Sequence, residues 1–511
     1  MRRFLGRLRN LDVARTRLRR WPRQVSRAIM LVCAVACLSC SASAFGQQQP
    51  VQPDFVSRLA QPWKGDLDGM LKRRFVRFLV PYNKTLYMID RGRQMGTMAE
   101  LGQAFEAWLN AKYAKGHLKI HVVFLPAARD ELIPDLTDGK GDVVAGELTI
   151  TPERQALVDF ATPWVRDVKE VVVAGPSSPR LASLDDLSGK EAFVRASSAY
   201  AGNLRRLSTD FAARGLSPIA IRPIDEDLED DDILQMVSAG LLPYAVVDDY
   251  QARIWAKILP GLRVRDDLVI HDDGATAWAV RKNSPLLQKE LAAFIAAHGP
   301  NTSFGATVMR RHFTGPEALR NADSPLAMQR FQELLRVFER AGAKYGFDDL
   351  MLMAQGYQES QLDQSRRSPR GAVGVMQVLP STAAAPPLNI RGVDRDVQAN
   401  VDAGAAYLRL VRDKYVNDPA LKDPDRTLMT FAAYNAGPGN FRRFRNAAAA
   451  SGLDPHVWFD NVETGAARVI GRETVQYVAN IFKYYISFKL AEERLEAKKE
   501  SQPARLPEKA P

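Results

Sequence analysis

The chain has 511 residues, 46% of them hydrophobic, and a formal net charge of +11. This length exceeds what one hydrophobic core supports, so we expect a soluble globular protein of two or three domains. The charge does not indicate nucleic-acid binding. Residues 1–44 contain ten arginines and one aspartate, a net of +9, and 11 − 9 leaves only +2 for the rest.

Residues 1–44 have the pattern of a secretory signal peptide. A basic stretch up to Arg27 precedes an apolar run, Ala28–Leu38, and small residues follow it. The run is too short to span a bilayer comfortably, and Ser41–Ala44 offers a cleavage site after Ala44. We therefore expect export to the periplasm, with an uncleaved anchor as the alternative and the outer membrane as a candidate location.

All three cysteines, Cys33, Cys37 and Cys40, lie in this leader. Cleavage after Ala44 leaves none, which excludes disulfides and thiol catalysis in the mature chain. Cys40 has the surroundings of a degenerate lipoprotein site. Membrane association would therefore come from a lipidated Cys40 or from peripheral contact.

Residues 45–70 are polar and contain prolines, which predicts a linker. From residue 71 to residue 298, strand patterns alternate with helix patterns. Residues 74–80 (RFVRFLV) and 118–125 predict strands, and residues 97–114 place their apolar side chains on one helix face. This alternation predicts an α/β domain with a mainly parallel sheet.

The segment Gly141–Trp164 (GDVVAGELTITPERQALVDFATPW) resembles the solute-binding domains of amino-acid transport systems, bacterial family 3. Residues 183–189 (SLDDLSG), 244–252 (YAVVDDYQA) and 278–283 (WAVRKN) fit later parts of the same pattern. The resemblance covers residues 71–298. It implies two lobes that close on a ligand by a hinge.

By this resemblance, Arg154 binds the α-carboxylate of an amino acid, Thr149 supports the same group and Asp249 accepts the α-ammonium. A planar guanidinium suits a carboxylate because two parallel N–H groups meet two oxygens. Glu147 stands where a small hydroxyl residue is common, and its carboxylate would repel a free amino acid's unless it pairs with a cation on the ligand. A larger or more cationic, peptide-like ligand therefore stays open. The alternative is that Arg154 and Asp249 only brace the cleft.

The sequence contains no recognisable metal or phosphate motif. The acidic run at 225–232 (DEDLEDDD) lacks the glycine and closing glutamate of a calcium loop and is interpreted as a solvated helix start. The six histidines are scattered and form no ligand spacing. We predict no metal site and no cofactor.

Residues 299–325 have no strong period and are predicted to connect two domains. Helical spacing resumes at Leu326 and continues to about residue 490. Residues 491–511 are charged and contain prolines, which predicts a loose tail.

Within this helical region, Glu359 stands out as a candidate acid. The preceding residues, Phe347–Tyr357, repeat their apolar positions at helical spacing, which places Glu359 at the end of a buried helix. Apolar surroundings disfavour the ionised carboxylate and raise its pKa. A raised pKa suits a general acid that works near neutral pH.

The stretches Gln355–Pro380 (QGYQESQLDQSRRSPRGAVGVMQVLP) and Ala433–Gly439 (AYNAGPG) resemble the Slt-type lytic transglycosylase family of lysozyme-like enzymes. Asn400–Leu408 (NVDAGAAYL) and Glu473–Val478 (ETVQYV) resemble further segments of that family. The resemblance implies a mainly α, lysozyme-like domain over residues 326–490. The whole chain is then a multidomain protein in which a two-lobed α/β periplasmic-binding-protein domain precedes it.

The second resemblance implies cleavage of the MurNAc–GlcNAc bond of peptidoglycan glycan strands by a single acid, without a cofactor. Glu359 would protonate the glycosidic oxygen and then accept the proton of the C6 hydroxyl, which closes a 1,6-anhydro ring. The residues that would contact the glycan or steady the acid are Ser368, Met376, Gln377, Tyr434, Asn435, Glu473 and Tyr477.

Two other functions stay open. A lysozyme-type hydrolase would need a positioned water and usually a second acid, for which Glu473 is the candidate. A non-catalytic cell-wall-binding protein would lack the acid, whereas Glu359 is present. The domain order further suggests that a cell-wall peptide or amino-acid-like effector in the first domain regulates the second, which requires different affinities for two states of the enzyme.

Overall fold

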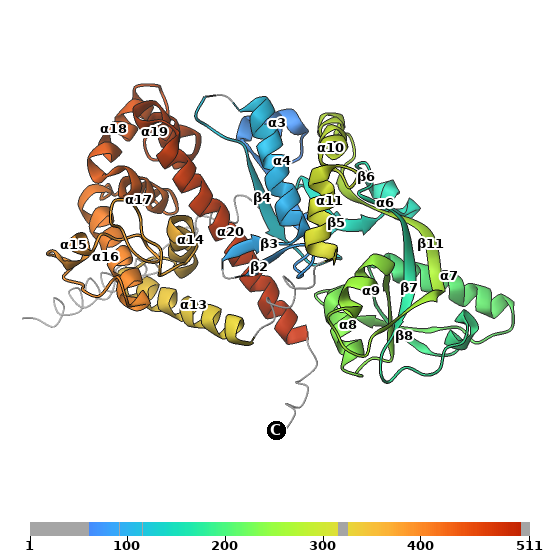
Figure 1. The fold of residues 1–511 in the computed structure, drawn as a ribbon. Helices are drawn as coiled ribbons and strands as arrows, with labels where there is room; N and C mark the ends of the chain where they lie inside the picture. The colour runs from blue at the N-terminus through green and yellow to red at the C-terminus, as the bar shows by residue number, and fades with distance from the viewer. Residues whose placement is uncertain (1–60, 91, 115, 315–324, 502–511) are drawn as a thin grey trace, which may run out of the picture. The chain divides into compact units, whose positions relative to one another are not determined.

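The computed structural model describes residues 61–501, except 91, 115 and 315–324 (Figure 1). The predicted signal peptide, Cys40 and most of the predicted first linker lie outside these residues. Among the helices that are described, none is long and apolar enough to cross a membrane.

The first part of the chain is an α/β region with two hydrophobic cores. Its elements around the first core are α3 (Leu67–Arg73), β1 (Phe75–Val80), β2 (Met88–Asp90), β3 (Arg93–Met95), α4 (Thr97–Tyr113), β4 (His121–Pro126), α5 (Leu132–Asp138), β5 (Val143–Thr149), α6 (Pro152–Leu157), β6 (Val158–Phe160), α10 (Pro285–His298), α11 (Ser303–Met309) and the π-helix Arg310–Thr314. Those around the second are the 3₁₀ helix Leu184–Leu187, β8 (Glu191–Arg195), α7 (Ala199–Ala213), β9 (Ala220–Ile224), α8 (Asp230–Ser238), β10 (Tyr244–Asp248) and α9 (Asp249–Ala256).

Two long strands, β7 (Val165–Ala174) and β11 (Arg263–Arg281), join the two lobes. At one end, Val165 and Trp278 pack in the first core, and at the other, Val171–Val173 and Leu268 pack in the second. The chain passes from one lobe to the other along these two strands. This is the geometry of a two-lobed binding domain.

The main sheet has the order β10-β7-β11-β5-β1-β4, with β6 paired to β11. β1 is parallel to β4 and β5, whereas β11 is antiparallel to β5, β6 and β7, and β10 is antiparallel to β7. The predicted mainly parallel sheet is therefore wrong in this respect. The reason is that β7 leaves the first lobe and β11 returns to it, so β11 runs in the opposite direction to β7 and meets β5 and β6 antiparallel.

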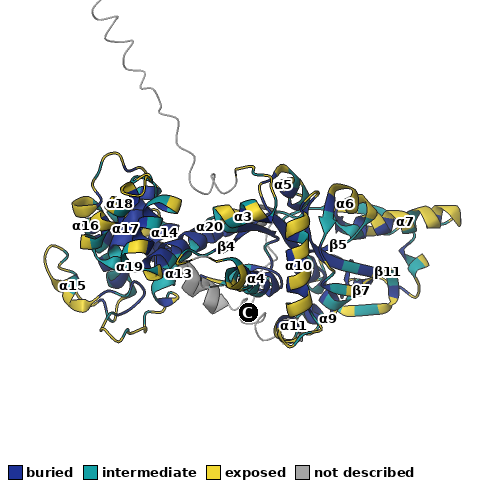
Figure 2. Cartoon of the chain, turned by 90° about the horizontal axis from the view of Figure 1, so that it is seen from above, coloured by how far each residue is buried: buried dark blue, intermediate teal, exposed yellow. Residues whose placement is uncertain are grey.

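Helices cover the sheet of the first lobe with one apolar face each. α4 buries Met98, Leu101, Phe105 and Leu109, as predicted for residues 97–114. α10 buries Leu287, Leu291 and Phe294 and leaves its other side exposed (Figure 2). Each of the two predicted linkers contains a helix. α3 begins within the first linker and buries Leu67 and Met70 in the first core, and α11 lies within the second linker and buries Val308.

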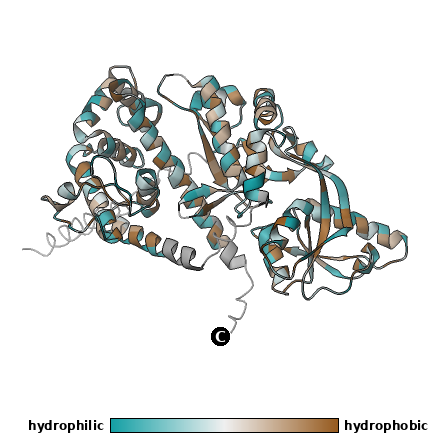
Figure 3. Cartoon of the chain, in the orientation of Figure 1, coloured by the Kyte–Doolittle hydropathy of each residue, from teal (hydrophilic) through white to brown (hydrophobic). Residues whose placement is uncertain are grey.

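The second part of the chain is helical, as predicted, and apolar and polar residues alternate around its helices (Figure 3). Its elements are α13 (Pro325–Tyr345), α14 (Asp349–Ser360), α15 (Pro380–Ala384), α16 (Val397–Tyr415), α17 (Asp425–Ala436), α18 (Pro438–Ala449), the π-helix Trp458–Val462, α19 (Glu463–Ile470) and α20 (Arg472–Ser501). α20 extends through the first half of the predicted tail, which is therefore not loose up to Ser501.

α20 also contacts the first lobe. Lys483 Nζ pairs with Glu106 Oε2 at 2.6 Å, and Gln94 Nε2 donates to Ser487 Oγ at 2.7 Å. Just before α20, Glu463 accepts from Arg74 Nη2 at 2.5 Å. Polar contacts thus tie the last helix to the first α/β lobe.

Asp142 forms ion pairs with three arginines at the edge of the first core and is itself fully buried. Its carboxylate pairs with Arg73, with Arg77 Nη2 at 3.0 Å and with Arg281 Nη2 at 3.4 Å. It also accepts from the Arg77 backbone N–H at 2.8 Å, which fixes the start of β5 against β1. A buried charge is tolerated only while its partners stay paired.

We predict that Asp142→Ala lowers the free energy of unfolding by about 3–5 kcal/mol, because it leaves buried guanidinium groups without a counter-charge. The control is Asp159→Ala, which removes an exposed pair with Lys282 and should cost at most about 1 kcal/mol. Urea unfolding measures both variants. Equal losses would contradict the structural role of Asp142.

Candidate functional site

Glu359 lies in the last turn of α14 and is half-buried. Asp348 caps the start of this helix by accepting from the Met351 backbone N–H, and Gln361 ends it in a left-handed conformation. The helix interior is apolar, with Leu352 and Ala354 fully buried. The sequence therefore folds here as predicted, with the acid at the end of a buried helix.

Tyr477, on α20, is the side-chain partner of Glu359. Its hydroxyl donates to Glu359 Oε1 at 2.6 Å and accepts from Gln355 Nε2 at 3.1 Å. Burial raises the pKa of Glu359 to about 7, and the hydrogen bond from Tyr477 opposes part of this rise. A carboxyl with this pKa can hold a proton at neutral pH and release it to a substrate.

The loop after α14 is held beside the acid by Asn400 of α16. Asn400 is buried, its Oδ1 accepts from the Met376 N–H at 2.8 Å, and its Nδ2 donates to the Val373 carbonyl at 2.8 Å. Gly374 has a φ of 76°, and a Cβ there would lie 2.3 Å from Asn400 Nδ2, so only glycine fits. Ser360 Oγ adds a bond to the Val375 carbonyl at 2.8 Å.

Tyr434, at the end of α17, completes the group around the acid. Its hydroxyl donates to the Met376 carbonyl at 3.0 Å. Burial, with the charge of Glu359 as a second cause, raises the pKa of Tyr434 well above its ordinary value. The structure thus brings together four of the predicted residues, Glu359, Met376, Tyr434 and Tyr477.

The other predicted glycan-contacting residues have local partners. Ser368 Oγ accepts from the Ala372 N–H at 3.0 Å, and Gln377 Nε2 donates to the Gly374 carbonyl at 2.8 Å, so both bond within the loop. Asn435 Oδ1 accepts from Thr474 Oγ1 at 2.6 Å. Glu473 is exposed, and no contact among the described residues joins it to Glu359. The roles of these residues stay predictions.

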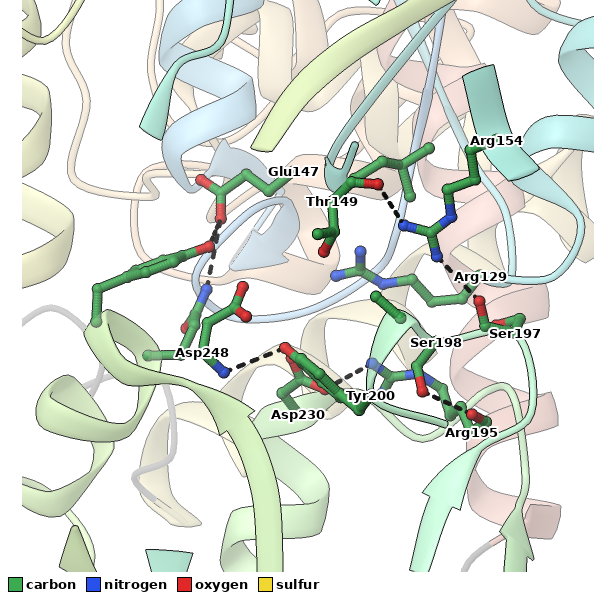
Figure 4. Close-up of a pocket in the computed structure, with 14 residues that line it drawn as sticks. Arg129, Glu147, Thr149, Arg154, Arg195, Ser197, Ser198, Tyr200, Asp230 and Asp248 are labelled. Carbon is green, nitrogen blue, oxygen red and sulfur yellow. Dashed lines mark hydrogen bonds and ion pairs between the residues drawn. The ribbon is translucent and has the colours of Figure 1, made fainter. Parts of the chain in front are cut away.

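A second candidate site is a pocket of the first region, with about 480 Å³ of empty space when the open solvent at its mouth is counted (Figure 4). Residues of both lobes line it, including Glu147 and Thr149 of β5, Tyr200 of α7 and Asp248 of β10. Arg154 lies in this pocket and donates to the main-chain carbonyls of Thr149 at 2.8 Å and Ser197 at 2.9 Å. Thr149 and Arg154 therefore both line this pocket, and their role in binding a carboxylate stays a prediction.

The structure places Asp248, rather than Asp249, in this pocket. Asp248 is the last residue of β10 and is buried, whereas Asp249 begins α9 and pairs with Arg253 at 2.6 Å. Successive side chains of an extended chain point to opposite sides, so a shift of one residue moves the carboxylate out of the site. The two adjacent acids could not be told apart from the sequence.

Within the described ranges, no three His, Cys, Asp or Glu side chains gather in a way that would hold a metal ion. Sequence reasoning did not identify Asn400 and Gln355 as positioning residues. Both lie inside the stretches that carried the family resemblance, but an amide that orients a loop or a tyrosine has no spacing of its own to mark it.

Two family models match the chain. Residues 79–307 match bacterial extracellular solute-binding proteins, family 3, and residues 336–455 match the transglycosylase SLT domain. Glu359 and Tyr434 lie within the second match, and the pocket residues lie within the first.

Several relatives share both parts of the chain. A membrane-bound lytic murein transglycosylase F of Desulfosudis oleivorans is 27% identical, over 80% of this chain and 88% of its own length. One of Ectopseudomonas mendocina is also 27% identical, over 80% of this chain and 83% of its own. Among solved structures, an ancestral arginine-binding protein bound to arginine is 22% identical over 47% of this chain and 98% of that chain, with a TM-score of 0.39.

We predict that Glu359→Gln stabilises the fold at about pH 8 but not at about pH 5. The folded pKa of about 7 lies above the ordinary value of 4.5, so the stability due to the protonated acid is present at low pH and lost as the pH rises through 7. This difference between the folded pKa and the ordinary pKa changes the free energy of unfolding by at most about 3 kcal/mol. Calorimetric unfolding at both pH values measures it.

The control for this prediction is Glu473→Gln, which changes an exposed acid in the same region. Its effect on stability should be small and similar at both pH values. If Glu359→Gln also had the same effect at both pH values, the buried and protonated state assigned to Glu359 would be contradicted.

Proposed function

Because the chain joins a family 3 solute-binding domain to a transglycosylase SLT domain, we propose that it is a lytic transglycosylase that cleaves the β-1,4 bond between MurNAc and GlcNAc in peptidoglycan. The observation that carries this proposal is the state of Glu359, a half-buried acid with a pKa of about 7 and one tyrosine partner. The relatives that share both domains are named lytic murein transglycosylases.

The proposed reaction uses Glu359 twice. The protonated carboxyl gives its proton to the glycosidic oxygen as the bond from that oxygen to C1 of MurNAc breaks, and the N-acetyl carbonyl of the sugar stabilises the cation that develops. The ionised carboxylate then accepts the proton of the C6 hydroxyl, whose oxygen bonds to C1. The products are a free GlcNAc hydroxyl and a 1,6-anhydro-MurNAc end, and no water is consumed.

Tyr477 and Tyr434 support this cycle in different ways. The Tyr477 hydroxyl hydrogen bonds to Glu359 and so stabilises the carboxylate between the two proton transfers. Tyr434 holds the Met376 carbonyl and lies close enough for the charge of Glu359 to affect its pKa. A tyrosine in this place can also steady the acetamido group of the substrate.

Among the described residues, no second carboxylate contributes to the pKa of Glu359, which favours this reaction over hydrolysis. Hydrolases with two carboxylates place them about 5–9.5 Å apart. Among the described residues, burial and Tyr477 are the influences on the pKa of Glu359, and Glu473 has no contact with it. A single acid is sufficient when the substrate supplies its own nucleophile.

We also propose that a cell-wall peptide or amino-acid-like effector in the first domain regulates cleavage. The support is α20, which carries Tyr477 beside Glu359 and, less than two turns later, Lys483 beside Glu106 of α4. A ligand that favours one arrangement of the first domain would act on the helix that holds the acid's partner. Such an effector must bind the two states with different affinities.

The same proposal includes export to the periplasm, which residues 1–44 predict, and association with a membrane, since both relatives above are named membrane-bound. The outer membrane is the membrane that we propose. Lipidation of Cys40 and peripheral contact are the two ways in which the chain could associate with the membrane. Membrane fractionation of a Cys40→Ala variant distinguishes them, because only a lipid anchor depends on that thiol.

We predict that Glu359→Gln lowers the rate at which purified sacculi dissolve by about 100- to 10,000-fold, the usual contribution of a general acid. The control is Asp413→Asn, which changes an exposed acid of α16 and should retain the activity. Turbidity of sacculi reports both rates. A wild-type rate in Glu359→Gln would refute the assigned acid, and an equal loss in Glu473→Gln would favour a two-acid hydrolase.

For the regulatory part, we predict that Lys483→Met brings the ratio of cleavage rates with and without added muropeptides closer to one, because it breaks the pair with Glu106. Lys414→Met, which changes an exposed lysine of α16, is the control. Both rates are measured on purified glycan strands. A ratio unchanged from the wild type in Lys483→Met would rule out this route of coupling.

A further inference from the structure

Glu147 is the least expected side chain in the pocket of the first domain. It is only 7% exposed, and its backbone has a φ of 50°, a left-handed conformation that costs a non-glycine residue about 1 kcal/mol or more. Oε2 accepts from Tyr250 Oη at 2.9 Å, whereas Oε1 is buried and has no hydrogen-bond partner among the described residues. The chain thus holds a carboxylate in the pocket at a cost and leaves half of it unpaired.

Asp248 is a second acid of this kind. It is 5% exposed, and its Oδ1 is buried without a hydrogen-bond partner in the described part of the chain. Burial raises the pKa of Asp248 well above its ordinary value and that of Glu147 to about 7. Both acids would ionise fully only beside a cation, which is also what would satisfy their free oxygens.

The arginines of the pocket do not supply that cation. Arg129 pairs with Glu229 at 2.9 Å, and Arg195 pairs with Asp230 at 2.5 Å. Arg154 remains. It donates to main-chain carbonyls, and the charge of Glu170 acts on it without an ion pair between the two among the described residues. Figure 4 shows Glu147 and Asp248 on one side of the pocket and Arg154 on the opposite side.

The charged residues of the pocket lining that form no ion pair among the described residues are therefore two carboxylates and one guanidinium. A complementary ligand has two cationic groups and one carboxylate. We infer that the pocket binds a free basic amino acid, with the α-carboxylate at Arg154, the α-ammonium at Asp248 and the side-chain cation at Glu147.

Related ligands would each leave one of these groups unpaired. A neutral amino acid has no cation for Glu147, and an acidic one brings a second carboxylate toward it. A basic residue at the C-terminus of a peptide has a carboxylate and a side-chain cation but no free α-ammonium for Asp248. Glu147 is thus the residue that selects for charge on the ligand's side chain, in the place where a small hydroxyl residue is common in the family.

The test is isothermal titration calorimetry of the full chain with lysine and with norleucine, which lacks only the side-chain cation. In the wild type we expect lysine to bind at least about tenfold more tightly, the loss typical of leaving a buried charge unpaired. Glu147→Gln keeps an acceptor for Tyr250 and should bring the two affinities within about threefold of each other. The control, Glu191→Gln, removes an exposed acid from the second lobe and should keep the wild-type ratio.

Equal affinities for lysine and norleucine in the wild type, no binding of lysine, or an unchanged ratio in Glu147→Gln would each overturn the inference. The dipeptide alanyl-lysine is the third ligand, and binding as tight as that of lysine would show that Asp248 does not receive an α-ammonium, which also overturns it. Circular dichroism confirms that each variant is folded.

This inference names the ligand class of the proposed effector site, and only its regulatory meaning rests on the proposed function. The titration contains no glycan, and repeating it on Glu359→Gln should give the same ratio. Failure of the binding prediction would therefore leave the cleavage assay untouched, and failure of cleavage would leave the binding result standing.

Discussion

The hydrogen bond from Tyr477 to Glu359 is the interaction on which the helical region depends for its chemistry. Burial alone would hold the acid in its neutral form, and an exposed carboxylate would be ionised at neutral pH. The tyrosine hydroxyl, 2.6 Å from Oε1, stabilises the anion without exposing it to water. The pKa of about 7 is the balance of these two influences, and the proposed reaction needs a group with such a pKa to give a proton and to take one back.

That balance requires two helices distant in sequence to meet in one place. α14 carries the acid and α20 carries the tyrosine. Gln355, one turn before Glu359, orients the tyrosine by donating a hydrogen bond to its hydroxyl. The buried amide of Asn400 fixes the loop that contains Met376, and the Met376 carbonyl accepts a hydrogen bond from the Tyr434 hydroxyl. The acid is therefore surrounded by groups that other buried residues hold still, which is what positioning in catalysis requires.

In the proposed regulation, α20 is the element that would connect ligand binding to cleavage. The helix that presents Tyr477 to the acid presents Lys483 and Ser487 to the first lobe. That lobe is itself braced by the buried cluster around Asp142. A change in the lobe would be passed on through rigid contacts rather than through a flexible linker.

Much of this could be predicted from the sequence, because helix periodicity and local motifs are short-range signals. The helix that ends at Glu359, the apolar face of α4 and the order of an α/β part before a helical part followed from them. The direction of β11 in the sheet and the meeting of Glu359 with Tyr477 depend on contacts between distant segments, which no local pattern encodes. The sequence also cannot separate Asp248 from Asp249, because the two acids differ only in the direction of their side chains. The charged end of α20 consists of strong helix formers, but its charge and prolines favour the interpretation as a tail.

The most direct test of the central claim, that Glu359 works as a single acid in an intramolecular transfer, is mass spectrometry of the muropeptides that the full chain releases from purified sacculi. The account predicts products with 1,6-anhydro ends, each one water lighter than the corresponding reducing form. Products with reducing ends would contradict it, since they require a water molecule and a group that positions it.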